Sequence, residues 1–232
     1  QRICRELRIW SKLKHEHILP LYGVAVGFNV IPDGMCVMWA ENGDLCQYLT
    51  DNSDLSLQHR LSMKHPEIQS IVHGNNVVHG DLTGVNVLVD NEGNTLLCDF
   101  GVSLIVGDIN DSFYETSSQQ KYNIAWSAPE ILFPGDSSPA RPTTFSDMYS
   151  FGSVMLQILT GQAPYNRQIS TQIAIYINRC QRDKAHPRRP PRPSFISDDL
   201  WTFMKQCWRS VPEERLCAER VYRFLCEYEH GI

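Results

Sequence analysis

The spacing of hydrophobic and polar residues predicts helices and short strands in the first hundred residues. Apolar residues recur at helical spacing over residues 3–15, with charged residues on the opposite face. Apolar runs at 17–30 and 34–40 predict two strands joined by a turn at Pro32–Gly34. Alternating apolar stretches at 86–90 and 94–100 predict a β-hairpin.

The remaining pattern is mainly helical. Residues 145–161 are strongly apolar and end at Gly161, which predicts a long buried helix. Amphipathic helices are predicted at 198–210 and 218–229. Residues 55–76 have partial helical periodicity, but they contain Pro66, so this helix should be kinked or broken.

Composition narrows the class of protein. The chain has 232 residues, of which 42% are hydrophobic and 20% charged, as in ordinary globular domains with a sizeable core. A net charge of -5 gives no support for a nucleic-acid partner, and no apolar run is long enough to cross a membrane. The eight cysteines are scattered singly, which predicts reduced core thiols, no zinc site and a cytoplasmic protein.

The polar residues inside one apolar stretch suggest chemistry. His79, Asp81 and Asn86 have the spacing HxDxxxxN ahead of a predicted strand, and Asp99-Phe100-Gly101 follows its hairpin partner. Two carboxylates and an amide at one end of a hairpin suit phosphoryl transfer, in which a protein positions a hydroxyl and neutralises phosphate charge through metal ions. Each motif alone is weak evidence. Ala128-Pro129-Glu130 and the segment 146–152 follow in order, which argues against coincidence.

With these motifs the chain resembles the eukaryotic protein kinase family, and within it the tyrosine-kinase-like group in the form common among fungal kinases. The resemblance runs from residue 1 to about 227. It implies an α+β, protein-kinase-like fold with a mostly helical C-lobe at 41–232. Residues 1–40 would form a partial β N-lobe with the regulatory helix and two strands, and residues 38–40 would be the hinge.

The resemblance also implies the roles of individual residues. Asp81 would orient the substrate hydroxyl and take its proton, while Asn86 and Asp99 would ligate Mg²⁺. The implied ATP contacts are Val37 at the gatekeeper position, Met38 and Ala40 at the hinge, Leu88 against the adenine ring, and Glu6 on the regulatory helix. Three structural features are also implied. One is a spine anchored by Asp147 and formed by Trp10, Leu21, His79 and Phe100. The others are Gly101 of the second motif, Asp99-Phe100-Gly101, and an ion pair between Glu130 and Arg215.

Several positions depart from the family pattern. No GxGxxG and no VAIK-like run occurs, so we expect this chain to lack the first three strands of the N-lobe and a lysine partner for Glu6. Gly80 replaces the usual arginine, which implies that a phosphate on the activation loop loses its partner. Thr83 stands where serine/threonine kinases have lysine, and Ala125 stands where related kinases often have arginine.

The implied function is transfer of the ATP γ-phosphate to serine or threonine hydroxyls of a protein substrate, with tyrosine as the alternative acceptor. Without a glycine loop and phosphate-binding lysine, this chain alone is expected to be weak or inactive. The main alternative is a pseudokinase scaffold or the product of a decaying gene copy. A nucleotide-free interaction module is a third hypothesis. The oligomeric state stays open.

Overall fold

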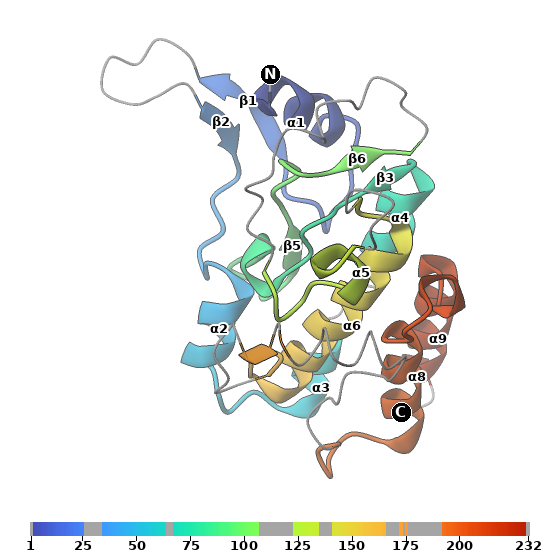
Figure 1. The fold of residues 1–232 in the computed structure, drawn as a ribbon. Coiled ribbons are helices and arrows are strands. Elements are labelled where there is room, and N and C mark those ends of the chain that lie inside the picture. Colours follow the sequence, from blue (N-terminus) through green and yellow to red (C-terminus); the bar gives the residue numbers. More distant parts are fainter. Residues whose placement is uncertain are drawn as a thin grey trace.

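The computed structural model describes residues 2–25, 34–63, 67–106, 123–134, 141–165, 172–173, 175 and 192–230. This part of the chain is a mixed α+β structure, mostly helical, with three small two-stranded sheets. Helix α1 and the β1–β2 sheet lie at one end of the molecule, and helices α8 and α9 lie at one side of the opposite end (Figure 1). Residues 107–122, which are rich in polar side chains, and most of the proline- and arginine-rich stretch at 186–193 lie outside the described residues.

The N-terminal elements confirm the predicted helix and strand pair, with shorter bounds. Helix α1 spans Arg2–Trp10 and is followed by a tight turn. Strands β1 (Leu21–Ala25) and β2 (Gly34–Val37) pair antiparallel, with an irregular register after Leu21. The indole nitrogen of Trp10 donates to the carbonyl of Leu19 at 2.7 Å, which ties α1 to the segment before β1.

The predicted hairpin is confirmed as strands β4 (Val87–Val89) and β5 (Thr95–Leu97), which pair antiparallel. The carboxylate of Asp90 accepts the backbone N–H groups of Glu92 and Asn94 at 2.9 and 2.8 Å, which closes the turn. The chain reaches this hairpin through β3 (Val77–Val78) and leaves it for β6 (Leu104–Ile105), and these two strands pair antiparallel. Strands β3 and β6 therefore lie just before and just after the segment that contains both motifs, the one from His79 to Asn86 and the one from Asp99 to Gly101.

The helix that contains Pro66 in its pattern is broken, as predicted. Helix α3 spans Leu57–Ser62 and helix α4 spans Glu67–Gly74, while residues 64–66 lie outside the described part. Upstream, Asp44 is the N-cap of α2 (Leu45–Asp51), and its carboxylate accepts backbone N–H groups of the first turn.

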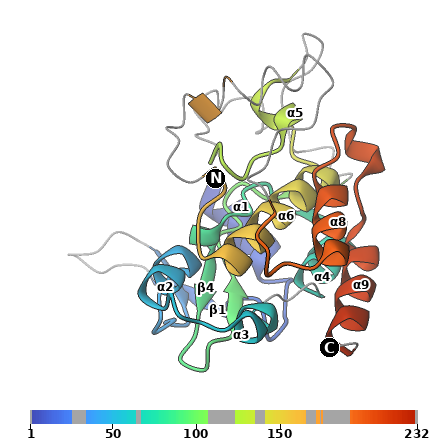
Figure 2. The same ribbon diagram turned by 90° about the horizontal axis from the view of Figure 1, so that it is seen from below.

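Helix α6 (Thr144–Thr160) confirms the predicted buried helix. Thr143 and Ser146 form a capping box at its start, and Gly161 ends it in the left-handed conformation with φ 71°. The helix crosses the middle of the molecule, with α8 (Asp198–Cys207) and α9 (Ala218–His230) on one side (Figure 2). The remaining short helices are α5 (Pro129–Leu132), η1 (Gly84–Asn86) and η3 (Pro212–Glu214).

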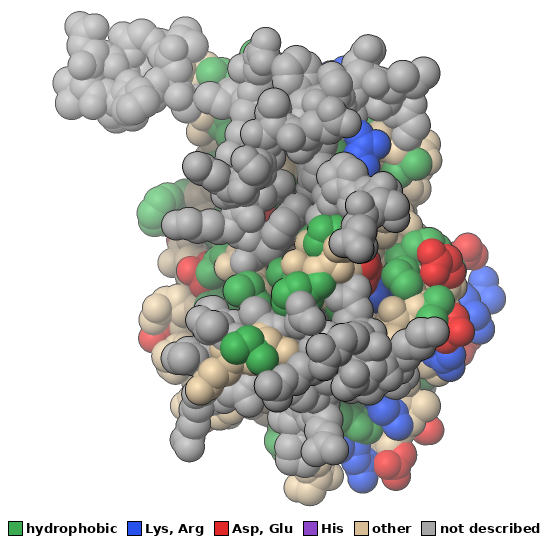
Figure 3. All heavy atoms as spheres, in the orientation of Figure 1, with side chains coloured by type: hydrophobic (Ala, Val, Ile, Leu, Met, Phe, Trp, Pro, Cys, Tyr) green, Lys and Arg blue, Asp and Glu red, His purple; other side chains and the backbone are tan. Residues whose placement is uncertain are grey.

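Close contact between α6 and α8 depends on a glycine. A Cβ atom at Gly152 would lie 2.7 Å from Nε1 of Trp208 and 2.9 Å from Cβ of Cys207. No side chain larger than hydrogen fits there without displacing a neighbouring side chain. Outside this contact, α8 and α9 carry charged side chains of both signs on the surface (Figure 3).

Arg60, on α3, is a buried arginine, and the sequence pattern did not predict its burial. Its guanidinium donates to the carbonyls of Leu55, Ser53 and Ile158 at 3.1, 3.1 and 3.0 Å. Ile158 lies in the last turn of α6, where a cation is favourable because the carbonyl groups there lack helical partners. Arg60 therefore fastens α3 to the C-terminal end of α6.

The prediction that the cysteines are core residues is wrong for most of the described ones. The seven described cysteines are free thiols, and only Cys207 is buried. Cys4, Cys36 and Cys217 are exposed, and Cys46, Cys98 and Cys226 are partly buried. Among the described residues, no helix is both long and apolar enough to span a bilayer.

Candidate functional site

The loop between β3 and η1 carries the first motif, and His79 fixes its course. This side chain is fully buried, and its Nε2 lies 3.0 Å from the carbonyl oxygen of Cys98. The backbone N–H of Asp81 donates to Nδ1 of His79 at 3.3 Å. A ring nitrogen that faces a carbonyl must carry hydrogen, and one that accepts an N–H cannot. In these two contacts Nε2 is therefore the donor and Nδ1 the acceptor.

Asp81 is half-buried and is held by two amides. Nδ2 of Asn86 donates to the backbone carbonyl of Asp81 at 2.8 Å and to its Oδ2 at 3.1 Å. Nδ2 of Asn123 lies 3.4 Å from the other carboxylate oxygen, Oδ1. Burial raises the pKa of Asp81, and the nearby Asp99 charge adds to this, while His79 and the two amides oppose it.

The second motif lies beside the first because β5 leads directly into it. The backbone N–H of Cys98 donates to the carbonyl of Asn86 at 3.0 Å. Asp99 follows in a left-handed conformation (φ 62°), and its exposed carboxylate accepts the N–H of Gly101 at 3.1 Å. The structure therefore brings Asn86 and Asp99 to the same end of the hairpin, as predicted from their spacing.

The donor set fits Mg²⁺ chemically. Asn86 uses its amide nitrogen on Asp81, so its oxygen is the atom that can face a cation, and Asp99 offers a carboxylate. Mg²⁺ in phosphoryl-transfer sites is held by one or two protein oxygens together with water and phosphate. No group of three or more His, Cys, Asp or Glu side chains that could hold a metal ion occurs among the described residues.

Phe100 connects the loop to α1. Its ring is 1% exposed and lies 5.2 Å from the His79 ring and 5.5 Å from the Trp10 ring, between centroids. Glu6 on α1 is also buried, and a Cβ atom at Gly101 would lie 3.2 Å from its Oε2. The Glu6 carboxylate thus lies directly against the second motif.

Asp147, at the start of α6, holds the same loop from below. Its Oδ2 accepts the backbone N–H of His79 at 2.8 Å, and its Oδ1 accepts that of Gly80 at 2.9 Å. Nε2 of His73, on α4, lies 3.1 Å from Oδ2. His73 and Asp147 are 74 positions apart, and no motif in the sequence indicates that they meet.

Glu130 and Arg215 form a two-bond ion pair. The guanidinium nitrogens donate to the two carboxylate oxygens at 2.6 and 2.8 Å. Arg215 also donates to the carbonyls of Phe145 and Arg209, both at 2.9 Å, and lies over the ring of Tyr149. The pair joins α5 to the N-terminal end of α6 and to η3.

The residues assigned to adenine lie where β2 leads into the linker before α2. Val37 is 38% exposed, Ala40 is buried, and the N–H of Met38 donates to the carbonyl of Pro20 at 3.3 Å. Leu88 is partly buried on the neighbouring strand β4. The linker and β4 are therefore adjacent, and the adenine contacts themselves stay predictions.

Thr83 cannot make the phosphate contact of the lysine that serine/threonine kinases have at its position. It is 2% exposed, and its hydroxyl makes no hydrogen bond within the part of the chain that the structure describes. A buried hydroxyl cannot reach a phosphate at the surface of the site. Ala125 offers no charge either.

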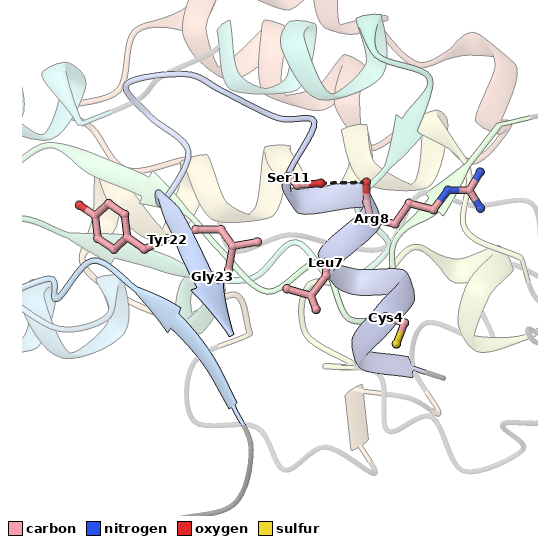
Figure 4. Close-up of a pocket in the computed structure, with 7 residues that line it drawn as sticks. Cys4, Leu7, Arg8, Ser11, Tyr22 and Gly23 are labelled. Atoms are coloured by element: carbon pink, nitrogen blue, oxygen red, sulfur yellow. Dashed lines mark hydrogen bonds between the residues drawn. The ribbon is translucent and has the colours of Figure 1, made fainter. Parts of the chain in front are cut away.

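An open groove of about 400 Å³ lies between α1 and β1, and none of Asp81, Asn86 and Asp99 lines it. Leu7 points from α1 toward β1, whereas Arg8 and Tyr22 point away (Figure 4). The groove shares no lining residue with the two motifs. It is therefore a separate surface feature.

Gly80 has a structural reason to be glycine. Its φ is 82°, and an added Cβ would lie 3.2 Å from Cγ of Pro142 and 3.3 Å from the carbonyl oxygen of Val102. Left-handed backbone disfavours residues with a Cβ, and the close contacts add to the cost. The usual arginine of the family would not fit this loop conformation without rearrangement.

We predict that Gly80→Ala lowers the free energy of unfolding by more than the roughly 1–2 kcal/mol of a left-handed alanine alone. Gly93→Ala is the matched control, because Gly93 has φ 88° but no atom within 3.7 Å of its added Cβ. Urea unfolding of both variants measures the difference. Equal losses in the two variants would contradict a role for Pro142 and Val102.

Comparison with known proteins agrees with the geometry. Tyrosine-protein kinase JAK1 of Danio rerio is 28% identical over 225 residues, which cover 92% of this chain. The chain spans only 19% of that relative's length. The family described as protein tyrosine and serine/threonine kinase matches residues 1–225. Because this match covers nearly the whole chain, the chain belongs to the protein tyrosine and serine/threonine kinase family.

Proposed function

We propose that this chain is a protein kinase domain that transfers the γ-phosphate of ATP to a serine or threonine hydroxyl of a protein substrate. The observation that carries the proposal is the convergence of Asp81, Asn86 and Asp99 at one end of the β4–β5 hairpin. Family membership supports the same chemistry. Tyrosine is the alternative acceptor, and the name of the Danio rerio relative is in line with it.

The proposed mechanism assigns proton transfer to Asp81. Its carboxylate would accept a hydrogen bond from the substrate hydroxyl, align the oxygen with the γ-phosphorus, and take the proton as the new P–O bond forms. A raised pKa makes this carboxylate a better proton acceptor. Asn86 and Asp99 would hold Mg²⁺, which supplies positive charge to the phosphate oxygens when bound.

The finer assignments belong to the same proposal. We assign residues 1–40 to an N-lobe and 41–232 to a C-lobe, with residues 38–40 as the hinge, and place the chain in the tyrosine-kinase-like group. Seven free cysteines among the described residues support a reducing, cytosolic setting.

A pseudokinase is the second candidate, and two observations favour it. The sequence has no GxGxxG or VAIK-like run, and Thr83 is buried where a phosphate-contacting lysine would lie. A scaffold would keep the fold and lose transfer, with or without nucleotide binding. A nucleotide-free interaction module is the extreme case.

Thermal and urea unfolding with Mg-ATP test the nucleotide site. Binding to the folded state alone raises stability by about 2.7 kcal/mol when the ligand is at a hundred times its dissociation constant. We expect a magnesium-dependent rise that Asp99→Asn removes, because the variant loses a carboxylate ligand. Asp199→Asn, an exposed carboxylate on α8, is the control and should keep the rise.

A rise in wild-type protein that persists in Asp99→Asn would contradict the assigned magnesium ligand. A cooperative transition with no rise at all would support the nucleotide-free module over the kinase.

A further inference from the structure

Trp126 lies in the turn before the Ala128-Pro129-Glu130 motif, and α6 holds it at two atoms. Its indole Nε1 donates to Oε1 of Gln157 at 3.1 Å. Its backbone carbonyl accepts the hydroxyl of Ser150 at 3.0 Å. Gln157 is 2% exposed, so its amide is a fully enclosed polar group that needs partners. The position of this turn is therefore set by side chains of the buried helix.

The Gln157 amide also contacts α2 and the catalytic loop. Its Nε2 donates to Sγ of Cys46 at 3.1 Å, which fixes the orientation of the amide. A Cβ atom at Gly84 would lie 2.5 Å from Oε1 of Gln157 and 2.8 Å from Sγ of Cys46. Only glycine lets the loop approach so closely. Three segments that are distant in sequence thus meet at one amide.

The turn transmits this position to Asn123. The carbonyl of Asn123 accepts the backbone N–H groups of Trp126 and Ser127 at 2.9 and 3.1 Å, and the Ser127 hydroxyl at 3.1 Å. The backbone of Asn123 is therefore fixed by the residues that α6 holds. Its side chain reaches the other way, with Nδ2 lying 3.4 Å from Oδ1 of Asp81.

We infer that Gln157 is a positioning residue that, through Trp126 and the turn at 123–127, places the Asn123 amide on the Asp81 carboxylate. Asn86 holds one oxygen of that carboxylate and Asn123 the other, so together they set its rotation. The kinetic consequence rests on the proposed function, but the hydrogen bonds themselves do not.

A glutamine suits this place because it both accepts and donates. Glutamate would accept from Trp126 but would offer no donor to Cys46 and would bury a charge. Methionine has a similar shape and makes neither bond. Gln157→Met therefore removes the polar link while filling the space.

The readout is the side-chain amide of Asn123. Its Nδ2 lies 3.4 Å from Oδ1 of Asp81, and an amide that donates to a carboxylate has an NMR signal displaced from that of an amide in water. Loss of that bond should move the Asn123 signals toward those of a solvent-exposed amide. A change in stability alone would not move these signals in a folded protein.

The experiment records ¹H–¹⁵N spectra of the side-chain amides in the 232-residue protein, with Asn123→Ala used to assign the Asn123 signals. We expect these signals to move in Asp81→Ala, which removes the acceptor, and to move in the same direction in Gln157→Met and in Trp126→Phe. The last variant removes only the indole donor and covers the case in which Gln157→Met fails to fold. Gln69→Met is the control, since Gln69 is also 2% exposed but lies on α4, and it should leave the Asn123 signals unchanged.

The outcomes separate the inference from the proposed function. A shift of the Asn123 signals in Asp81→Ala but not in Trp126→Phe or Gln157→Met would overturn the link through Gln157. No shift in any variant would overturn the inference entirely. If wild-type protein transfers phosphate, Gln157→Met should lower kcat by up to about a hundredfold without raising KM for ATP. If it transfers none, the spectra still decide the inference while the proposed function fails.

Discussion

Asp81→Asn is expected to lower phosphoryl transfer by about 10²–10⁴-fold, the range that a positioned general base contributes. The amide keeps the size of the carboxylate but cannot take the proton of a substrate hydroxyl. Transfer of labelled γ-phosphate from Mg-ATP to a general protein substrate measures the loss. Activity equal to that of wild type would show that the transfer belongs to another residue or to a contaminant.

The same substitution is expected to change stability in a pH-dependent way. Burial raises the pKa of folded Asp81 above that of an aspartate in the unfolded chain, so the ionised form is disfavoured in the folded state. This penalty is absent below the unfolded pKa and becomes complete as pH rises through the folded pKa. The free energy of unfolding of Asp81→Asn, relative to wild type, should therefore increase between acidic and neutral pH, as urea unfolding at several pH values would show.

Arg215→Met is expected to lower the free energy of unfolding by about 3 kcal/mol, the lower end of the range for a buried ion pair, because the arginine is enclosed while the Glu130 side chain is 26% exposed. The Arg215 side chain is fully enclosed, and its loss leaves the Glu130 carboxylate and the carbonyls of Phe145 and Arg209 without their donors. Chemical denaturation gives the value directly.

Arg223→Met is the matched control for that loss. Arg223 pairs with Glu219 at 3.2 Å, but the two side chains are 68% and 74% exposed, so the change should stay within about 1 kcal/mol. Adding Glu130→Gln to Arg215→Met should recover part of the loss, because the stranded charge disappears. A double variant less stable than Arg215→Met would argue that Glu130 has a further favourable contact.

Local sequence order explains why the central part of the site was predictable. Asn86 and Cys98 flank a short hairpin, and its register brings Asn86 and Asp99 together once the strands pair. The apolar pattern likewise predicted α6 and its end at Gly161, because an unbroken buried face followed by glycine has few other solutions.

Contacts between distant polar residues could not be predicted in the same way. Arg60 and Ile158 are 98 positions apart, His73 and Asp147 are 74 apart, and Trp126 and Gln157 are 31 apart. Which buried donor meets which acceptor is decided by how helices pack, and hydrophobic periodicity carries no information about it. The exposed cysteines show the same limit, because an apolar neighbourhood in sequence did not imply burial in space.

The hydrogen bonds from the backbone of His79 and Gly80 to Asp147 determine when, during translation, the loop that carries Asp81 can reach its final conformation. Asp147 comes 68 residues after His79, so on the ribosome the loop that carries Asp81 emerges well before the carboxylate that holds it. Closing so long a stretch of chain has an entropic cost, which the burial of α6 must offset. A nascent chain that ends before α6 therefore lacks the contact that holds the loop carrying Asp81, and this loop takes its final course only when α6 is present.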